Sequence, residues 1–392
     1  MRVLFVHNQY RRRSGEEESI DKIGALLRLD GHEVALCQDF SARYAGIWGQ
    51  LAAGFSGLHS VAGMRKVRDA VSQFRPDIVQ FQNVYPGFSP SAVVAVSRMG
   101  IPTVMRCPNY RLFCPSGLFM DRNGVICERC VSPGREMWCV TKNCEGNLVK
   151  SASYAARNFL ARIRGAFLNH VDLFIVQSEF QRGKFEEYGV PSAALAVVPG
   201  FAARIFGETK LGDEVVYIGR LSREKGIADF LRAAALLPDV PFTVVGGDAT
   251  PEFGVVPSNV RFAGFVEGEA LDAAFLNARI VVIPSKCYEG FPNAVARAMA
   301  ARRPVIASKL GVLEEVVVNG RTGLTVPSGN PAAIAEAIRY LYPNIELCKA
   351  MGVAAADLVS VRYTVEPVRR ALISAYERAR ERRAARRQVS VR

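Results

Sequence analysis

Two cations follow an apolar run that ends in glycine in the second half of the chain. The run at residues 215–219 leads to Arg220 and, five positions later, to Lys225. Arginine offers a planar fork of donors and lysine a mobile point charge, a combination suited to a diphosphate. The segment therefore predicts a diphosphate site, and the alternative is a solvated basic loop without a ligand.

A carboxylate lies between an apolar run and a predicted helix in a second segment. Glu289 follows the run at 280–284, and a helical pattern covers residues 294–302. The first turn of a helix presents free N–H groups and a positive dipole end, which favour phosphate oxygens. Glu289 is placed to accept hydrogen bonds from sugar hydroxyls, or else it only complements the helix dipole.

The first apolar run of the chain, at residues 3–7, ends in His7 and precedes three arginines at 11–13. These cations favour an acidic acceptor or a lipid diphosphate, and solvated side chains are the alternative. His7 is a candidate active-site group, although a histidine without a partner is more often structural.

Parallel sheets must position these residues. Short β-branched runs bounded by turn residues alternate with amphipathic stretches, which is the pattern of βα units, and the series restarts after a linker predicted at 199–212. In such sheets ligands bind beyond the carboxyl ends of the strands, where the candidate residues stand. The predicted strands cover residues 3–7, 34–37, 78–82, 103–107, 173–177, 195–198, 215–219, 242–246, 260–263, 280–284, 305–308 and 324–326.

Length and composition bound the class of protein. The 392 residues exceed the size at which one core keeps growing, so we expect two domains. No apolar stretch reaches the roughly 18 residues of a membrane span, and we predict a cytoplasmic protein with reduced cysteines. The net charge of +13 implies an anionic partner, and residues 361–392 hold ten arginines against three glutamates. A nucleic-acid partner ranks last, because this basic tail lacks interleaved aromatic residues.

Five cysteines fall within the 31 residues from 114 to 144. Their C-x-x-C pair suits a structural zinc held by four thiolates, and buried thiols that pack as small hydrophobes are the alternative. The zinc ligands in the first case are Cys127, Cys130, Cys139 and Cys144.

Residues 148–170 show a basic amphipathic pattern. Lys150, Arg157 and Arg164 recur at seven-residue intervals, which predicts one basic stripe on a helix beside a second, apolar stripe. Such a helix can lie on an anionic membrane surface, and a core helix with a solvated face is the alternative. The apolar stripe holds Phe159, Ile163 and Phe167.

The segments around Arg220 and Glu289 resemble the C-terminal domain of the retaining GT-B glycosyltransferases of family 4. The resemblance extends through 304–308 and 320–324, and stretches at 31–34, 75–79 and 177–180 resemble that family's N-terminal domain, so that it covers nearly the whole chain. It implies an α/β fold with two Rossmann-like, doubly wound parallel-sheet domains that face each other across a cleft.

The resemblance assigns a role to each expected domain. An acceptor-binding domain covers residues 1–199, with a cysteine-rich insertion near 107–144. A nucleotide-sugar-binding domain covers residues 200–362. A basic C-terminal helix at 363–392 follows, and it is free to cross back to the N-terminal domain.

The resemblance also implies a site and a chemistry. Arg220, Lys225 and Glu289 become the catalytic residues, because the cations hold the donor diphosphate and stabilise the charge that grows on it as it leaves, while Glu289 binds the sugar. This chemistry requires no cofactor or metal. The implied donor-binding residues are Gly219, Arg220, Lys225, Gly246, Glu289, Gly290, Phe291, Pro292, Asn293 and Arg297. The acceptor-binding residues are His7, Ser14, Gly15, Glu16 and Asn109.

Two positions depart from the family's pattern. Arg297 stands where a second glutamate usually holds the ribose hydroxyls, and arginine cannot accept a hydrogen bond. Either another acceptor, such as Glu314 or Glu315, serves the ribose, or donor binding is weakened. Pro108, with Asn109 after it, replaces a histidine that usually contacts the sugar.

The predicted function is transfer of a sugar, with retention, from a nucleotide-diphosphate sugar to an acceptor. The acceptor is a glycan, a glycolipid or a lipid-linked molecule in cell-surface polysaccharide or glycoconjugate synthesis. The cytoplasmic enzyme would act in solution or as a peripheral protein on an anionic inner membrane face. The alternatives are a catalytically weak binding subunit with the same fold and a sugar-nucleotide epimerase, for which only His7 is an evident acid or base.

Overall fold

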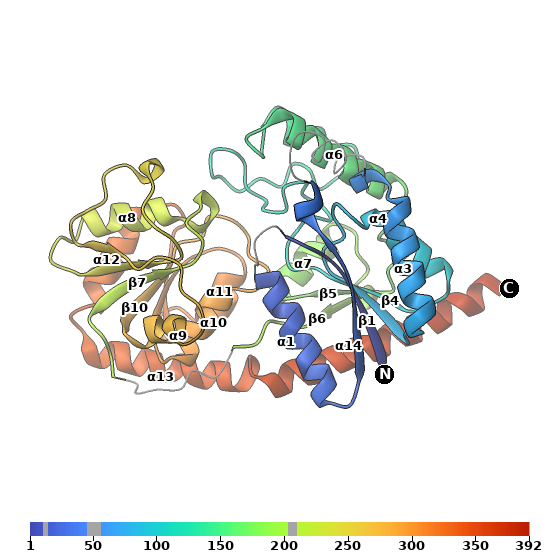
Figure 1. Ribbon diagram of the computed structural model, residues 1–392. Helices are drawn as coiled ribbons and strands as arrows, with labels where there is room; N and C mark the ends of the chain where they lie inside the picture. The colour runs from blue at the N-terminus through green and yellow to red at the C-terminus, as the bar shows by residue number, and fades with distance from the viewer. Residues whose placement is uncertain (11–14, 45–55, 203–209, 392) are drawn as a thin grey trace. The chain divides into compact units, whose positions relative to one another are not determined.

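The structure is a computed structural model, which describes residues 1–10, 15–44, 56–202 and 210–391. Its contacts divide the chain into two compact units (Figure 1). The first unit contains Met1–Arg122, Cys127–Val198 and Arg369–Arg392, and the second contains Asn123–Ile126 and Pro199–Val368. Each unit is built on a six-stranded sheet.

The first sheet has the strand order β2-β1-β3-β4-β5-β6, and all neighbouring strands are parallel. Its strands are β1 (Arg2–Gln9), β2 (Glu33–Phe40), β3 (Ile78–Phe81), β4 (Thr103–Arg106), β5 (Leu173–Val176) and β6 (Leu195–Val197). The helices of this unit are α1 (Gly15–Leu29), α3 (Val61–Phe74), α4 (Ser89–Arg98), α5 (Met137–Thr141), α6 (Leu148–Ile163) and α7 (Glu179–Glu187), with short 3₁₀ turns η1 (Ser41–Tyr44) and η2 (Ser192–Ala194).

The second sheet has the order β12-β11-β10-β7-β8-β9 and is also parallel. Its strands are β7 (Glu214–Ile218), β8 (Phe242–Val245), β9 (Val260–Phe262), β10 (Ala278–Ile283), β11 (Val305–Ser308) and β12 (Gly323–Val326). The helices are η3 (Arg223–Lys225), α8 (Ile227–Ala235), η4 (Pro251–Phe253), α9 (Gly268–Leu276), α10 (Asn293–Ala300), α11 (Val312–Val316), α12 (Pro331–Leu341) and α13 (Ile345–Arg362).

The central strands are buried on both faces, as expected of parallel sheets that helices cover on either side. In β7, Val216 and Ile218 belong to one core cluster, whereas Val215 and Tyr217 belong to another. Successive side chains of a strand point to opposite faces, so these clusters lie on the two sides of the sheet. All twelve predicted strands are present, and the prediction of an α/β fold with two parallel sheets is confirmed.

The last helix, α14 (Val365–Val391), returns to the first unit from Arg369 onward. Arg369 bonds the Asp30 carboxylate at 2.8 Å, and Arg383 bonds that of Asp172 at 3.0 Å. Tyr376 is fully buried between these two contacts. Part of the arginine excess of the C-terminal segment is therefore used in intramolecular ion pairs.

The helical stripes predicted over residues 148–170 are wrong in two respects. Helix α6 ends at Ile163, and Gly165 takes a left-handed φ of +56°, a common way for a helix to stop. Phe167 therefore lies beyond the helix, where it is buried. Arg157 is also buried, because its guanidinium stacks 4.2 Å from the ring centre of Tyr85. Among the described residues, no helix combines the length and the hydropathy that a membrane-spanning segment requires.

Candidate active site

Two loops leave neighbouring strands of the second sheet at its carboxyl edge. One follows β7 and contains η3, and the other joins β10 to α10. Gly226 lies against the second loop with φ +74°, and a Cβ there would stand 1.9 Å from the Pro284 carbonyl oxygen. The N–H of Lys286 donates to the Glu224 carbonyl at 2.8 Å. Only glycine permits this close approach, which brings together the two segments that the sequence singled out.

Lys225 and Glu289 meet where these loops join. The Lys225 Nζ lies 2.9 Å from Glu289 Oε2, and the Ser285 hydroxyl donates to the other carboxylate oxygen. The side chains are only 25% and 10% exposed. Burial by itself lowers the pKa of Lys225, but the Glu289 carboxylate outweighs it, and the pKa is raised. Lys225 therefore stays protonated at neutral pH.

Arg220 lies at the start of the same loop and faces solvent. Its side chain is 71% exposed, and Nη2 contacts Glu224 Oε1 at 2.9 Å. A surface ion pair of this kind is weak and easily exchanged for another partner. The loop thus carries the half-buried Lys225 and two exposed cations, Arg220 and Arg223.

The segment between Glu289 and α10 is packed rather than open. Gly290, Phe291 and Pro292 are buried, and α10 begins at the exposed Asn293. The Phe291 ring packs edge-on against Tyr363, with ring centres 5.2 Å apart. Phe291 thus anchors this segment to the hydrophobic core. The parts of the segment that a ligand can reach are the exposed side chain of Asn293 and the N-terminus of α10.

Gly246 and Gly219 join the ends of β8 and β7. A Cβ on Gly246, which has φ +135°, would stand 2.0 Å from the Gly219 carbonyl oxygen, and the Gly219 N–H donates to the Val245 carbonyl at 3.0 Å. Both glycines therefore shape the start of the cationic loop.

The Arg297 side chain forms an ion pair within the second unit. Its Nη2 donates to Asp272 Oδ1 of α9 at 2.6 Å, and its guanidinium lies 5.7 Å from the ring centre of Phe275. The side chain is only 16% exposed. Glu314 and Glu315, the other carboxylates considered for the ribose, stand in the first turn of α11.

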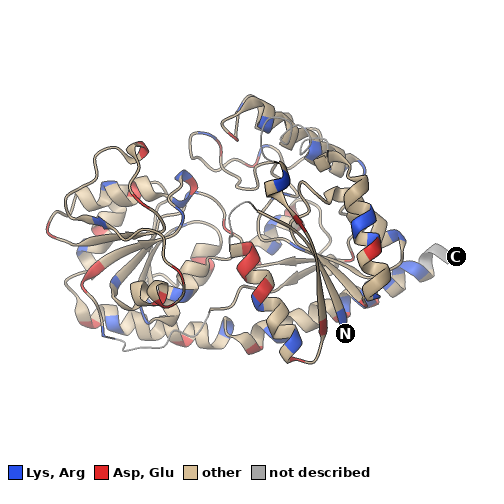
Figure 2. Cartoon of the chain, in the orientation of Figure 1, with Lys and Arg blue, Asp and Glu red and all other residues tan. Residues whose placement is uncertain are grey.

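In the first unit, His7 pairs with Glu17 at the carboxyl edge of the sheet. His7 Nε2 lies 3.2 Å from Glu17 Oε1, which also accepts the Tyr10 N–H at 2.9 Å. His7 and Glu17 are both buried. Gly15 opens α1, whose first turn is acidic (Figure 2). Ser14 and the arginines at 11–13 lie outside the described residues.

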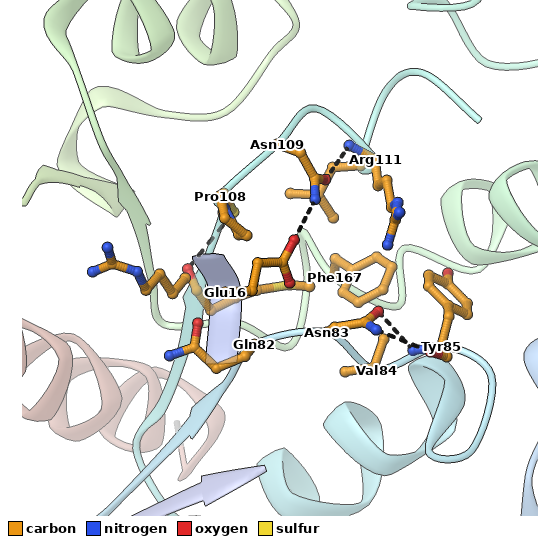
Figure 3. Close-up of a pocket in the computed structure, with 13 residues that line it drawn as sticks. Glu16, Gln82, Asn83, Val84, Tyr85, Pro108, Asn109, Arg111 and Phe167 are labelled. Carbon is orange, nitrogen blue, oxygen red and sulfur yellow. Dashed lines mark hydrogen bonds between the residues drawn. The ribbon is translucent and has the colours of Figure 1, made fainter. Parts of the chain in front are cut away.

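Glu16 and Asn109, two predicted acceptor-binding residues, are in contact. Asn109 Nδ2 donates to Glu16 Oε1 at 3.1 Å, and both residues line a small cavity of about 30 Å³ (Figure 3). The Tyr10 hydroxyl donates to Glu16 at 3.2 Å, and Arg111 Nη1 donates to that hydroxyl at 2.5 Å. Burial raises the pKa of the Glu16 carboxyl, although the charge of Arg111 opposes this. Pro108 also lines the cavity.

Two buried donors stand at the same edge. Gln82 follows β3, and Arg106 is the last residue of the adjacent strand β4. Both side chains line the cavity, and they are 5% and 2% exposed. Among the described residues, Gln82 Nε2 and Arg106 Nη1 have no hydrogen-bond partner. Burial lowers the pKa of Arg106 to about 10, so it remains a cation at neutral pH. Buried polar groups normally have hydrogen-bond partners, so these two nitrogens are candidates to bond a ligand or a water molecule.

The cysteine-rich segment packs as thiols. Cys130 and Cys139 are buried in a small cluster with Ala155 of α6, and Cys144 packs at its edge. A hydrogen bond between the thiols of Cys139 and Cys144 raises the pKa of the first and lowers that of the second. Within the described part of the chain, no three His, Cys, Asp or Glu side chains are arranged to hold a metal ion. The four cysteines of the zinc hypothesis, which include Cys127, are not gathered into such a group there, and the zinc site stays a prediction.

Sequence reasoning did not single out Tyr10, Glu17, Arg106 or Arg111. Arg111 reaches Tyr10 from 101 residues away. No local pattern marks such a contact, because it depends on the order of the strands. The arginine's position soon after a predicted strand end was the one available signal.

Two family models match this sequence. Residues 14–200 match the glycosyl transferase 4-like domain, and residues 212–344 match glycosyl transferases group 1. Together they cover most of the chain and correspond to the two parallel sheets.

Curated relatives match over shorter segments. An alpha-D-kanosaminyltransferase of Streptomyces kanamyceticus is 29% identical over 38% of this chain and 42% of its own length. A phosphatidyl-myo-inositol mannosyltransferase of Mycobacterium leprae is 31% identical over 45% of this chain and 49% of its own length. This chain thus spans about half the length of the curated relatives it matches.

Solved structures match the fold over nearly all of the chain. Sucrose-phosphate synthase from Thermosynechococcus elongatus superposes with a TM-score of 0.71 at 16% identity, covering 96% of this chain and 98% of that one. Anabaena Alr3699/HepE in complex with UDP-glucose gives a TM-score of 0.65 at 18% identity, covering 96% and 99%. The two parallel sheets and these neighbours show the GT-B fold. The two family models, which together cover most of the chain, show that it belongs to the group 1 glycosyltransferases and fits their family 4.

Proposed function

We propose that this chain transfers a sugar, with retention, from a nucleoside-diphosphate sugar to an acceptor. The observation that carries the proposal is the contact of Lys225 with Glu289 at the carboxyl edge of the second sheet. A cation for phosphate and a carboxylate for sugar hydroxyls stand side by side there. A nucleoside-diphosphate sugar presents both kinds of partner, phosphate oxygens for the cation and sugar hydroxyls for the carboxylate.

The two cations act on the leaving group. As the glycosidic bond breaks, negative charge grows on the nucleoside diphosphate, and fixed positive charges stabilise that state more than the ground state. Lys225 is held in place by Glu289, whereas the exposed Arg220 can close on the phosphates and bind them in a bidentate manner. Because these side chains supply the positive charge, the proposed chemistry assigns no role to a metal.

The proposed donor carries uridine. The solved complexes of Anabaena Alr3699/HepE contain UDP or UDP-glucose, and the same fold extends over this chain. UDP and UDP-glucose are therefore the first ligands to test. The N-terminus of α10, beginning at Asn293, is the proposed contact for the phosphate or sugar oxygens.

The acceptor is proposed to bind at the cavity of the first unit. Asn109 and Glu16 offer polar contacts, and His7 lies near Glu16. Gln82 Nε2 and Arg106 Nη1, which have no partner within the described part of the chain, are available to one acceptor hydroxyl, the size of group that a cavity of about 30 Å³ admits. This chemistry suits a hydroxyl-rich glycan, glycolipid or lipid-linked acceptor. We propose a role in cell-surface polysaccharide or glycoconjugate synthesis, in the cytoplasm or at the inner face of the membrane.

A panel of nucleotide sugars tests the donor. A ligand at 100 times its Kd adds about 2.7 kcal/mol of stability, which a thermal-shift assay detects. We expect UDP-glucose to raise the Tm, and NMR of the product made from it to show that the anomeric configuration is retained. If no nucleotide sugar raises the Tm, the proposal fails at its first step.

A second candidate, a binding subunit without turnover, is favoured by Arg297. This residue occupies the usual ribose-binding position and is tied to Asp272. Both candidates predict donor binding, but only an active transferase slowly hydrolyses its donor. Release of UDP from UDP-glucose without an acceptor therefore distinguishes them.

A further inference from the structure

Helix α6 turns its apolar side toward solvent and its polar residues toward the protein. Ser151, Arg157 and Asn158 are buried, and Asn158 donates to the Arg111 carbonyl at 2.7 Å. A helix on the surface of a globular protein normally shows the opposite arrangement. The reversal needs an explanation, because apolar side chains gain nothing from facing water. The buried polar residues are bonded only in part, since Arg157 Nε and Asn158 Oδ1 have no hydrogen-bond partner among the residues that the structure describes.

The exposed side of α6 forms one continuous stripe. Val149 is 73% exposed, Ile163 55% and Phe159 39%, and the two residues between them on the same face are Ala152 and Ala156. Their spacing of three and four residues places them in a single line along the helix. The whole of α6 contains no Asp or Glu (Figure 2).

Helix α5 extends this apolar surface. Met137 and Trp138 are 61% and 41% exposed, and Cys139 beside them packs against Ala155 of α6. The Arg129 guanidinium lies 4.9 Å from the ring centre of Trp138. Tryptophan beside arginine is typical of the boundary between lipid headgroups and acyl chains.

The segment around the stripe is basic. Residues 127–170 contain seven Lys and Arg against three Glu, a net charge of +4. The three glutamates are paired within the first unit, Glu128 with Lys184, Glu136 with Arg162 and Glu145 with Lys150. The remaining exposed cations are Arg129, Arg135 and Arg164.

We propose that the outer face of α5 and α6 docks this chain on an anionic lipid bilayer. The apolar stripe would enter the boundary between headgroups and acyl chains, while the surrounding arginines contact anionic headgroups. A second copy of the chain is a poorer occupant, because a symmetric contact would bring two surfaces of the same charge together. The docking face belongs to the first unit and Lys225 and Glu289 belong to the second, so its test is independent of the proposed transfer reaction.

Vesicle flotation tests the docking face. We expect wild-type protein to float with vesicles of 70% phosphatidylcholine and 30% phosphatidylglycerol, and to bind pure phosphatidylcholine at least tenfold less. The double variant Phe159→Ser/Ile163→Ser should bind the anionic vesicles at least tenfold less than wild type. The matched control is Val353→Ser/Val361→Ser, which changes two exposed apolar residues of the second unit and should leave binding unchanged.

Trp138 reports on insertion. The chain has two tryptophans, and in a Trp48→Phe background the emission comes from Trp138 alone. We expect a blue shift with anionic vesicles and quenching by lipids brominated on the acyl chain. Binding without quenching would mean attraction by charge alone, and the proposed insertion would be wrong.

Three other outcomes overturn the proposal. Wild-type protein that stays unbound excludes a lipid surface, and equal binding by wild type and the Phe159/Ile163 variant excludes the stripe. If ultracentrifugation shows a dimer that the same variant loses, the face belongs to a second copy. Thermal melting and UDP binding of the variant should match wild type, which shows that its fold and donor site are intact.

Discussion

Replacing Lys225 with methionine tests the donor site at its best-defined contact. Hydrogen bonds to charged groups contribute about 1.5–3 kcal/mol, so loss of one to the diphosphate should weaken UDP binding about 10- to 150-fold. Lys225 already contacts Glu289 at 2.9 Å, and the phosphates must compete with that carboxylate. We therefore expect the lower part of this range, measured by isothermal titration calorimetry.

Glu289→Gln gives the complementary measurement. Glutamine keeps the size of the side chain and an oxygen that accepts from Ser285. UDP affinity should stay within about threefold or improve, because a negative charge near the phosphates is removed. UDP-glucose should lose about tenfold in affinity relative to UDP, because glutamine is a weaker acceptor for sugar hydroxyls.

Stability measurements separate a binding effect from a folding effect. Breaking a fully buried ion pair costs about 3–5 kcal/mol, but a quarter of Lys225 is exposed and Ser285 still bonds Glu289, so we expect about 1–2 kcal/mol from urea unfolding. Arg261→Met, which breaks an exposed pair with Glu214, is the control and should cost at most about 1 kcal/mol. A folded Lys225→Met protein with wild-type UDP affinity would refute the assignment of the diphosphate site.

Four further predictions concern other parts of the chain. Burial raises the folded-state pKa of Glu16, so ionisation of this carboxyl opposes folding, and wild-type stability falls as pH rises through that pKa. Glu16→Gln should therefore raise the Tm at pH 8. Equal melting curves of the two proteins at pH 8 would contradict this. The Tm gain should disappear once the pH falls to the unfolded-state value near 4.5. Arg297→Glu should cost about 1–3 kcal/mol, because it faces the Asp272 carboxylate, and adding Asp272→Arg should recover most of the loss in a double-mutant cycle. If the paired variant also binds UDP more tightly, position 297 contacts the ribose, and unchanged affinity would argue against that contact. Gly226→Ala should cost at least about 1–3 kcal/mol and weaken UDP binding, since its Cβ would clash with the Pro284 carbonyl, and a folded variant with normal affinity would show that the two loops need not touch. Elemental analysis should find zinc well below one atom per chain if the cysteine cluster consists of thiols, whereas about one atom would establish a metal site.

Short sequence patterns predicted most of the fold, that is, the strands and their arrangement in parallel sheets. Runs such as Leu173–Val176 are apolar throughout, as a strand buried on both faces requires, and the alternation with helices predicts a parallel sheet. Because loops leave such sheets at one edge, the same pattern placed Arg220, Lys225 and Glu289 near one another. All of this information lies within short windows of sequence.

Contacts between distant residues needed the tertiary structure. Arg111 and Tyr10 belong to segments 101 residues apart, and they meet because β1 and β4 both pair with β3. Arg297 likewise finds Asp272 on another helix. The partners are 101 and 25 residues apart, so no window of the length of a typical helix or strand contains both partners of either contact.

The orientation of α6, that is, which of its faces is buried, is the clearest example of what the local sequence pattern does not determine. Its sequence contains both an apolar stripe and arginines, and periodicity indicates that the helix has two faces. Which face is buried depends on what the rest of the unit offers: the ring of Tyr85 receives Arg157, while Phe159 is left 39% exposed. Amphipathic spacing is a property of the helix alone, whereas burial is a property of the surfaces that pack against it.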